Sequence, residues 1–474
     1  MQIELDEKLV QMDQLFLLVK KLLEEYQKFR ESGWQQAGRE QCISVMNDIR
    51  QTAAAAGVSI NDVADTLARV FWQDREGSVL SELEHVLTEL LARVQQMYLA
   101  CMHDEASYHK VLLENYYQTN YEKNALVFYV VYPFLFPGTL PGHTNQVEAR
   151  AMTEVLRDMG YNVDLANTRY SGAVAAETYD LVVGSGACFE NLLTRLRPEA
   201  AAVCYLTESS PYFANPAELR RLRAFEQRNG RRLPFERQSV NFLNLAALMN
   251  ADAAICVGNA QTASTYADMC AAVYPIDVTG FTGAFTLDQN EKAAGHERNF
   301  LWYGGAGPVH KGLDLCIEAF RKLPEAVLHI VGEAPAEFYD YYREDLENRE
   351  NIFYYGFLGK EDETFRKVCA QCGWVLSPSC SEGQSTSVIT AMAAGMIPVC
   401  TKETGLDVED YGGEWIADCT PDGLRKLVRK LLETEEQEVI RRQRQASHLV
   451  QRRHSIEHYK EQLAERFAAI HTHV

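Results

Sequence analysis

The sequence predicts an α/β protein with two doubly wound domains in tandem, preceded by an α-helical segment. A helical apolar period runs through the first 120 residues, and from about residue 124 short apolar strands alternate with amphipathic helices. The same alternation starts again at residue 299. Strand–helix alternation of this kind implies a parallel sheet with helices on both faces. We therefore divide the chain into residues 1–120, 121–294, 295–445 and 446–474, the last a helix expected to pack back across the domains.

The composition is that of an ordinary globular protein, with 47% hydrophobic and 24% charged residues. There are 46 Lys and Arg against 66 Asp and Glu, a net charge of −20, which argues against a dedicated nucleic-acid binder. The longest apolar run, Ala125–Phe136, contains Pro133 and is too short to span a bilayer, and no signal peptide is visible at Met1. We expect a cytoplasmic protein with at most peripheral contact with the inner membrane face.

The twelve cysteines have no framework spacing, and several lie in apolar strand-like runs. We interpret them as reduced core residues. The single CxxC, Cys369–Cys372, has no second pair at ligand spacing, so zinc or redox chemistry is the weaker interpretation. No Asp-x-Asp pair of metal-ligand type stands out, and we expect no metal or other cofactor.

Two apolar seams at helical spacing define the segment 1–120. The first is Leu5, Leu9, Met12, Phe16, Val19, Leu23 and Tyr26, and the second is Leu80, Leu83, Leu87, Leu90, Val94, Met97 and Cys101. Ser59 between them is a predicted N-cap. We expect the two seams to pack on each other. The alternative is that one seam binds a second copy of the chain or a partner protein.

The predicted elements follow in two sets. Strands of the first set are 125–132, 161–166, 180–184, 201–206 and 253–257, with a helix at 145–159. Asp288–Arg298 is polar without periodicity, and we expect an interdomain linker there. Strands of the second set are 299–303, 327–331, 352–355, 374–377 and 397–400, with helices at 313–322, 360–371 and 386–394. The helical pattern 441–474 is interrupted near His454-Ser455.

Three loops between a strand and a helix contain the small residues that let backbone N–H groups approach a phosphate. They are Phe136–Asn145, Tyr303–Gly312 and Ser377–Thr386. The second loop contains Lys311, and the third places Glu382 beside Gly383 at a predicted helix start. None matches a P-loop, so ATP hydrolysis of that type is not expected. In tandem doubly wound domains, ligands bind in the cleft at the carboxyl ends of the strands.

Five blocks, in order, carry a resemblance to a known family. They are Phe300–Gly305 with His310–Leu315, then Leu328–Gly332, Ile352–Gly356, Leu376–Gly383, and Ala391–Val399. This region resembles the carboxyl-terminal half of retaining GT-B-fold glycosyltransferases of the glycosyl transferases group 1 (GT4) type. Residues 125–290 resemble the amino-terminal half in layout. The resemblance implies two Rossmann-like domains facing a cleft.

The resemblance also implies roles for individual residues. Lys311 matches the lysine that contacts the donor diphosphate, and Glu382 matches the first carboxylate of the E-x7-E motif, which holds the donor sugar. The N–H groups offered to sugar and phosphate would come from Gly383, Gln384, Ser385 and Thr386. The nucleobase would lie by Gly332, Gly356, Phe357 and Leu358. Gly142 and His143 match the loop near the donor phosphates and the acceptor.

Two positions depart from the family pattern. Ala306 stands where the family usually has an arginine that shares the phosphate charge, and Thr390 replaces the second glutamate, which binds the ribose. Losing one charged phosphate contact costs on the order of 1–3 kcal/mol if nothing replaces it. Thr390 retains a hydroxyl that can hydrogen-bond a ribose.

Further residues are weighed without the resemblance deciding them. His143 either acts near the acceptor or caps the following helix. Glu208, which follows a strand, is a candidate acceptor contact with Tyr212, and a loop hydrogen bond is the alternative. A basic stretch comprises Arg220, Arg221, Arg223, Arg228, Arg231, Arg232 and Arg237. We expect a solvated helix face there, with binding of an anionic acceptor or membrane as the alternative.

The expected activity is transfer of a sugar from a UDP- or GDP-sugar to an acceptor hydroxyl, with Lys311, Glu382 and His143 as the catalytic residues. The acceptor would be a glycan, a lipid-linked sugar or a small molecule. Retention of configuration is what the resemblance implies. One alternative is a nucleotide-sugar epimerase, which needs no acceptor. Another is a catalytically silent scaffold that supports a partner transferase through residues 1–120.

Overall fold

The computed structural model describes residues 111–135, 143–238, 245–280, 292–359 and 362–471, with a few positions before them (18, 22, 44–49 and 51–52). The two apolar seams, the predicted N-cap Ser59 and Gly142 lie outside the described residues. The chain divides into two compact units, the second formed by residues 113–129, 143–169 and 173–474. Both predicted sheets lie in this second unit.

The first sheet has the strand order β1-β3-β2-β4-β5-β6-β7. Its strands are β1 (Leu112–Leu113), β2 (Lys123–Tyr129), β3 (Tyr161–Asn167), β4 (Leu181–Gly184), β5 (Ala201–Leu206), β6 (Ala253–Val257) and β7 (Val273–Ile276). Every pairing from β3 to β7 is parallel. The strands are buried because runs such as Ala125–Tyr129 and Ala201–Leu206 carry apolar side chains on both faces.

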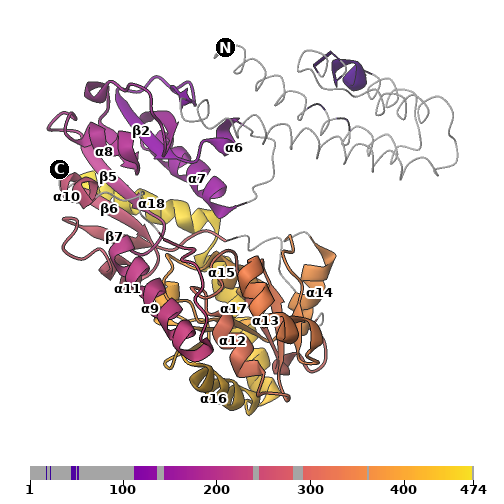
Figure 1. The fold of residues 1–474 in the computed structure, drawn as a ribbon. Coiled ribbons are helices and arrows are strands. Elements are labelled where there is room, and N and C mark those ends of the chain that lie inside the picture. The colour runs from indigo at the N-terminus through magenta and orange to yellow at the C-terminus, as the bar shows by residue number, and fades with distance from the viewer. Residues whose placement is uncertain are drawn as a thin grey trace. The chain divides into compact units, whose positions relative to one another are not determined.

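Helices of the first sheet are α7 (Thr144–Asp158), α8 (Ala187–Leu193), α9 (Pro211–Asn229), α10 (Leu245–Asn250) and α11 (Ala260–Ser264). α9 begins with Ser210 as N-cap and Pro211 in its first turn, and it ends at Gly230, whose φ of 64° favours glycine. Its Leu222 and Phe225, with the following Leu233, pack in the core of the second sheet (Figure 1). α9 therefore joins the two sheets.

The second sheet has the strand order β10-β9-β8-β11-β12-β13, all parallel. Its strands are β8 (Asn299–Tyr303), β9 (Val327–Val331), β10 (Ile352–Tyr354), β11 (Trp374–Ser377), β12 (Ile397–Cys400) and β13 (Glu414–Trp415). Its helices are α12 (Leu313–Phe320), α13 (Ala336–Asn348), α14 (Glu363–Gln371), α15 (Thr386–Ala393) and α16 (Pro421–Leu432). Trp302 and Trp374 are among the largest fully buried side chains.

The chain ends with α17 (Glu436–Arg453) and α18 (Ile456–His471), which meet at His454-Ser455. α17 packs on α15 and β12 of the second sheet, and α18 packs on α7 and β7 of the first (Figure 1). The Tyr459 hydroxyl lies 2.6 Å from that of Tyr205 on β5. The sequence therefore located the interruption of this helical pattern, and its two halves serve different sheets.

Two described segments differ from their sequence-based interpretation. Residues 113–120 had been included in the helical segment, but the Asn115 N–H donates to Asp164 on β3 and β1 is the edge of the first sheet. The described part of the predicted linker, residues 292–298, packs against the second sheet's domain. Lys292 Nζ donates to the carbonyls of Cys369 and Cys372, and His296 is buried. The polar composition of the segment does not predict the Lys292 contacts, because their partners are backbone carbonyls, which any residue has.

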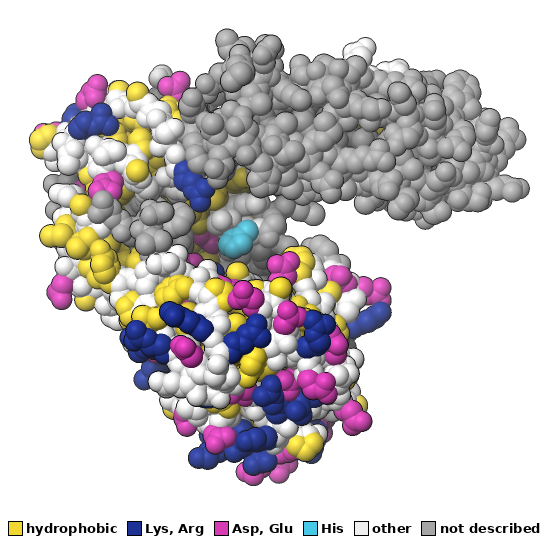
Figure 2. All heavy atoms as spheres, viewed as in Figure 1, with side chains coloured by type: hydrophobic (Ala, Val, Ile, Leu, Met, Phe, Trp, Pro, Cys, Tyr) yellow, Lys and Arg dark blue, Asp and Glu magenta, His cyan; other side chains and the backbone are white. Residues whose placement is uncertain are grey.

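Surface and cysteine chemistry agree with the composition. Lys and Arg side chains lie interspersed with Asp and Glu over the part of the molecule that holds α12 and α13 (Figure 2). The ten cysteines that the structure describes are free, and Cys204, Cys256 and Cys400 are buried. Burial raises the pKa of Cys369 to about 12, so this thiol of the CxxC is protonated at neutral pH. No helix among the described residues is long and apolar enough to cross a membrane.

Candidate active site

The second sheet reverses its strand order between β8 and β11. From β8 the chain proceeds outward to β9 and β10, then returns to place β11 on the other side of β8. In open parallel sheets, ligands bind outside the carboxyl ends of the strands at such a switch point. The loops that leave β8 and β11 there are 304–312 and 378–385, which are the second and third loops singled out by sequence.

Lys311 and Glu382 meet at this switch point. The Lys311 ammonium lies 2.5 Å from Glu382 Oε1, and the side chains are 15% and 10% exposed. Ser379 Oγ donates to the same carboxylate oxygen at 2.8 Å. Burial raises the pKa of Glu382, but the charges of Lys311 and Arg237 outweigh it and lower the pKa to about 2. Glu382 is thus a buried carboxylate held as an anion.

The glycine-rich loop fixes Lys311 through its backbone. Gly312 has a φ of 70°, and a Cβ there would lie 2.6 Å from the Pro378 carbonyl oxygen, so this position favours glycine on two grounds. The Trp302 indole N–H donates to the Lys311 carbonyl. A Cβ at Gly304 would lie 3.1 Å from Lys311 Cδ, so the small residue makes room for the lysine stem.

His310 connects the two loops and has a raised pKa. Its Nε2 lies 2.5 Å from the Ser381 carbonyl, and its Nδ1 lies 3.5 Å from the buried Glu218 carboxylate of α9. Burial lowers the pKa of His310, but interactions with Cys380 and Glu218 outweigh it and raise the pKa to about 10. No local sequence pattern indicates this contact, because Glu218 is almost a hundred residues away from His310.

The loop after β11 is pressed against the first sheet's loops. A Cβ at Gly383 would lie 2.1 Å from the Thr207 carbonyl oxygen, and Thr262 Oγ1 donates to the Gly383 carbonyl. Ser209 Oγ donates to the Glu382 carbonyl. Gly383 therefore allows a close backbone approach, and residues from the first sheet help to position Glu382.

The predicted amide donors are not all equivalent. The Ser385 N–H donates to the Thr404 carbonyl, so it is already paired, contrary to the expectation that it is offered to phosphate. α15 begins at Thr386, and its N-cap Ser385 makes no side-chain capping hydrogen bond. Thr390 is buried and donates its hydroxyl proton to the Thr386 carbonyl, which leaves this oxygen only as an acceptor for a ribose hydroxyl.

The residues assigned to the nucleobase lie at the carboxyl ends of β9 and β10. The Gly332 N–H donates to the Gly356 carbonyl at 2.8 Å. With a φ of 144°, a Cβ at Gly332 would lie 2.0 Å from the Gly304 carbonyl oxygen, so these loops are in close backbone contact. Phe357 is 72% exposed, and Leu358 is half-buried. The exposed Phe357 ring is unusual for a large apolar side chain.

The three residues on the first sheet's side that are predicted to contact the acceptor differ in their partners and exposure. His143 is the N-cap of α7, and its Nδ1 accepts from the Asn145 N–H at 3.2 Å, which is the capping geometry considered above. Glu208 accepts from Arg237 Nη2 at 2.8 Å and is 53% exposed, and Tyr212 at the start of α9 is 56% exposed. Among the described residues, the ion pair of Lys311 is with Glu382 and that of Glu208 is with Arg237.

The basic stretch is more than a solvated helix face. Arg221 donates to the Pro378 carbonyl, and Arg228 pairs with Asp314 and Glu318 of α12. Arg237 joins the site through Glu208. The expectation of a solvated face is therefore wrong for these three arginines, because α9 packs against the second sheet. The excess of arginine in an acidic chain was the signal that could have indicated an internal role.

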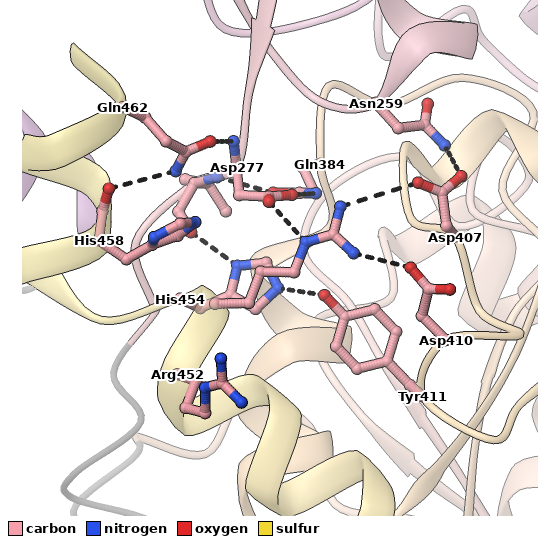
Figure 3. A network of polar contacts seen from close by, with 12 residues as sticks. Asn259, Asp277, Gln384, Asp407, Asp410, Tyr411, Arg452, His454, His458 and Gln462 are labelled. Carbon is pink, nitrogen blue, oxygen red and sulfur yellow. Dashed lines mark hydrogen bonds and ion pairs between the residues drawn. The ribbon is translucent and has the colours of Figure 1, made fainter. Parts of the chain in front are cut away.

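A second polar network lies where the chain passes between the sheets (Figure 3). Arg453 Nε donates to Asp277, which follows β7, at 2.6 Å, and its Nη1 lies 2.9 Å from Asp410. Gln384 donates to Asp277 and accepts from the Val278 N–H. Gln384, which follows Glu382 and Gly383, is therefore held by this crossover network. The sequence analysis did not predict the network.

His454 lies at the centre of the same network. Its Nδ1 is 2.7 Å from the Val278 carbonyl and its Nε2 is 2.8 Å from the Tyr411 hydroxyl, so the arrangement suits a neutral ring with the proton on Nδ1 (Figure 3). Burial lowers the pKa of His454 to about 4. The crossover is thus held by a histidine that is uncharged at neutral pH.

The two side chains of the candidate site lie in a region of the chain that is similar to a known family. Residues 285–447 match the model of the family described as glycosyl transferases group 1, and this range contains both Lys311 and Glu382. A glycogen synthase from Thermodesulfovibrio yellowstonii is 30% identical over 103 residues, which are 21% of this chain and 21% of that protein. The match thus spans about a fifth of the curated relative.

Solved structures show the fold. Sucrose-phosphate synthase from Thermosynechococcus elongatus superposes with a TM-score of 0.52 at 13% identity, covering 74% of this chain and 100% of that one. HepE from Anabaena in complex with UDP-glucose has a TM-score of 0.48 at 13% identity, covering 73% and 99%. The superposition on sucrose-phosphate synthase, together with the two parallel sheets, confirms the predicted fold class, GT-B with two Rossmann-like domains.

Proposed function

We propose that this protein transfers a sugar from a nucleotide-diphospho-sugar, with UDP or GDP as the nucleotide, to an acceptor hydroxyl with retention of configuration. The observation that carries the proposal is the Lys311–Glu382 ion pair at the switch point of a domain that matches glycosyl transferases group 1. A cation and a carboxylate held together there provide the two kinds of group that a sugar diphosphate requires.

The chemistry divides between the two side chains. The Lys311 ammonium meets the charge that develops on the departing diphosphate, which is electrostatic stabilisation of the leaving group. Glu382, held as an anion, accepts hydrogen bonds from sugar hydroxyls and orients the donor. The uncapped N-terminus of α15 offers further N–H groups to phosphate. This division requires no metal or other cofactor.

The remaining predicted residues complete the proposal. Gly332, Gly356, Phe357 and Leu358 border the nucleobase, and the Phe357 ring offers it an apolar face. His143, Glu208 and Tyr212 serve the acceptor, which is a glycan, a lipid-linked sugar or a small molecule. Residues 1–120 would bind a second copy or a partner protein. The protein would act in the cytoplasm, with at most peripheral contact with the inner membrane face.

The departures from the family pattern at Ala306 and Thr390 are the reason to test the silent-scaffold alternative. If the site were silent, no nucleotide-sugar would bind and no turnover would occur without a partner transferase. An epimerase would convert the donor without an acceptor. Product analysis of purified protein with donor alone, and then with acceptor, separates these outcomes from transfer, and the anomeric configuration of the product tests retention.

The direct test is a thermal-shift panel of UDP-, GDP-, ADP- and dTDP-sugars followed by two substitutions. A donor at about 100 times its dissociation constant stabilises the fold by roughly 2.7 kcal/mol. Lys311→Ala and Glu382→Ala are each expected to lower kcat by about 100- to 1,000-fold, a loss typical of electrostatic transition-state contacts. Lys322→Ala, at an exposed position after α12, is the control. Normal turnover in both site variants would refute this assignment.

A further inference from the structure

Arg237 reaches the glycine-rich loop from a segment that follows α9. A Cβ at Gly307 would lie 2.5 Å from Arg237 Cγ, so the arginine stem lies directly against that glycine. Its Nη2 is 2.8 Å from Glu208, and its charge contributes to the low pKa of Glu382. Arg237 therefore lies beside the Lys311–Glu382 pair, although it comes from the part of the chain that belongs with the first sheet.

Backbone contacts hold this segment in place from two sides. The buried Glu218 carboxylate accepts the N–H groups of Glu236 and Arg237, both at 3.0 Å. Glu236 in turn accepts the Gly307 N–H at 3.1 Å. The position of Arg237 is thus built by three residues that join α9 to the loop after β8. A flexible side chain would not need these backbone contacts in order to reach an exposed carboxylate such as Glu208.

The charges at the site show why a second cation matters. Lys311 is already paired with Glu382, and His310 is only 3% exposed and is turned toward Ser381 and Glu218. A diphosphate entering here therefore meets the Glu382 and Glu208 carboxylates as well as Lys311. The Arg237 side chain is 25% exposed, so it has access to a ligand.

The partner of Arg237 can be exchanged at low cost. Glu208 is 53% exposed, and ion pairs with such a partner contribute little to stability because water competes for both charges. A diphosphate offers a guanidinium two or more oxygens in the geometry that it binds best. The Glu208–Arg237 pair is consequently weaker than the contact that would replace it.

We propose that Arg237 binds the diphosphate of the donor, reaching across from the first sheet's side to supply the charge that the loop lacks at Ala306. The proposal rests on the function proposed above. Donor binding would draw Arg237 away from Glu208 and leave that carboxylate free for an acceptor hydroxyl. The donor site is then complete only when the segment after α9 is docked on the loop 304–312.

The test measures binding of a nucleoside diphosphate and of its nucleoside by calorimetry, using the base that the thermal-shift panel selects. Arg237→Ala is expected to weaken diphosphate binding by about 10- to 100-fold and to leave nucleoside binding unchanged, because a charged hydrogen bond is lost. Arg237→Lys is expected to recover part of the loss. Arg223→Ala, at an exposed position of the same basic stretch, is expected to bind like the wild type.

Two further variants sharpen the result. Glu208→Gln removes the competing carboxylate and is expected to tighten diphosphate binding several-fold. Ala306→Arg in the Arg237→Ala background is expected to restore it, since the guanidinium would then come from the loop itself. Thermal unfolding of each free variant shows whether folding is retained, and Arg237→Gln replaces Arg237→Ala if it is not.

The outcomes separate the two proposals. Diphosphate affinity that falls in Lys311→Ala but stays at the wild-type value in Arg237→Ala would overturn the role of Arg237 alone. Equal loss of nucleoside and diphosphate affinity in Arg237→Ala would also overturn it, because that pattern indicates a collapsed site. If the wild-type protein binds no nucleotide at all, the proposed function fails and the inference fails with it.

Discussion

His310 in the glycine-rich loop 304–312 and His454 in the crossover network are both almost completely buried, at 3% and 0% exposure, yet one is expected to be charged and the other neutral. The pKa of His310 is raised to about 10, and the pKa of His454 is lowered to about 4. Burial alone lowers the pKa of both rings. The difference arises because His310 faces the Glu218 carboxylate, whereas His454 lies between a carbonyl and a tyrosine hydroxyl.

The comparison teaches that the immediate partners of a buried histidine, and not its burial, decide its charge: a carboxylate faces His310, whereas only neutral groups bond to the His454 ring. Around the loop 304–312, cations and carboxylates lie close together, so an anionic ligand can replace a carboxylate as the partner of a cation. At the crossover, a neutral ring can satisfy two hydrogen bonds without a counter-charge.

The largest effect is expected from removing the counter-charge of His310. Glu218→Gln keeps the shape of the side chain but leaves a buried imidazolium without its carboxylate, so we expect the free energy of unfolding to fall by about 3–5 kcal/mol. Urea denaturation at neutral pH measures it. Glu226→Gln, at an exposed position of the same helix α9, should change stability by less than about 0.5 kcal/mol. A loss below 1 kcal/mol in Glu218→Gln would mean that His310 is neutral.

The second effect is a pH dependence of opposite sign for the two rings. The folded pKa of His454 is below its ordinary value of 6.5, so the unfolded chain binds the extra proton and stability falls as pH decreases from 6.5 to 4, by about 3 kcal/mol in total. The folded pKa of His310 is above 6.5, so its contribution is complete below 6.5 and is lost as pH rises toward 10.

Denaturation curves across this pH range test both signs. His454→Gln is expected to flatten the acid side only, and His310→Gln the alkaline side only. His329, whose pKa burial also lowers to about 4, adds to the acid side in both variants and in the wild type. If His454→Gln left the slope between pH 4 and 6.5 as it is in the wild type, a neutral crossover histidine would be excluded.

The smallest effects come from two of the three carboxylates that pair with Arg453. Asp277 is 10% exposed and Asp410 is 55% exposed, so they form a matched pair. Asp277→Asn is expected to cost about 2 kcal/mol, because it removes a buried charged hydrogen bond. Asp410→Asn should cost less than about 1 kcal/mol, and this loss should shrink further at high salt. Equal losses would show that burial does not decide the strength of this network.

The sequence by itself determined the strands and the loops that matter for function. Nine of its ten predicted strands, among them 201–206, 299–303 and 374–377, agree with the structure to within one residue at each end, because fully buried parallel strands are short apolar runs with clear ends. Lys311 and Glu382 were singled out as candidates as well, since each lies in a small-residue loop between a strand and a helix, a pattern that is local in the chain; their roles remain a prediction.

Only the tertiary structure decided which distant residues join that site. Arg237 lies 74 positions before Lys311, and Asp277 lies 176 positions before Arg453, so no local pattern relates them. Arginines on a helix face have the same spacing whether water or another domain covers them. The packing of α9 on the second sheet turned an apparently solvated basic stretch into part of a charged site, because side-chain partners depend on contacts that form only in the folded chain.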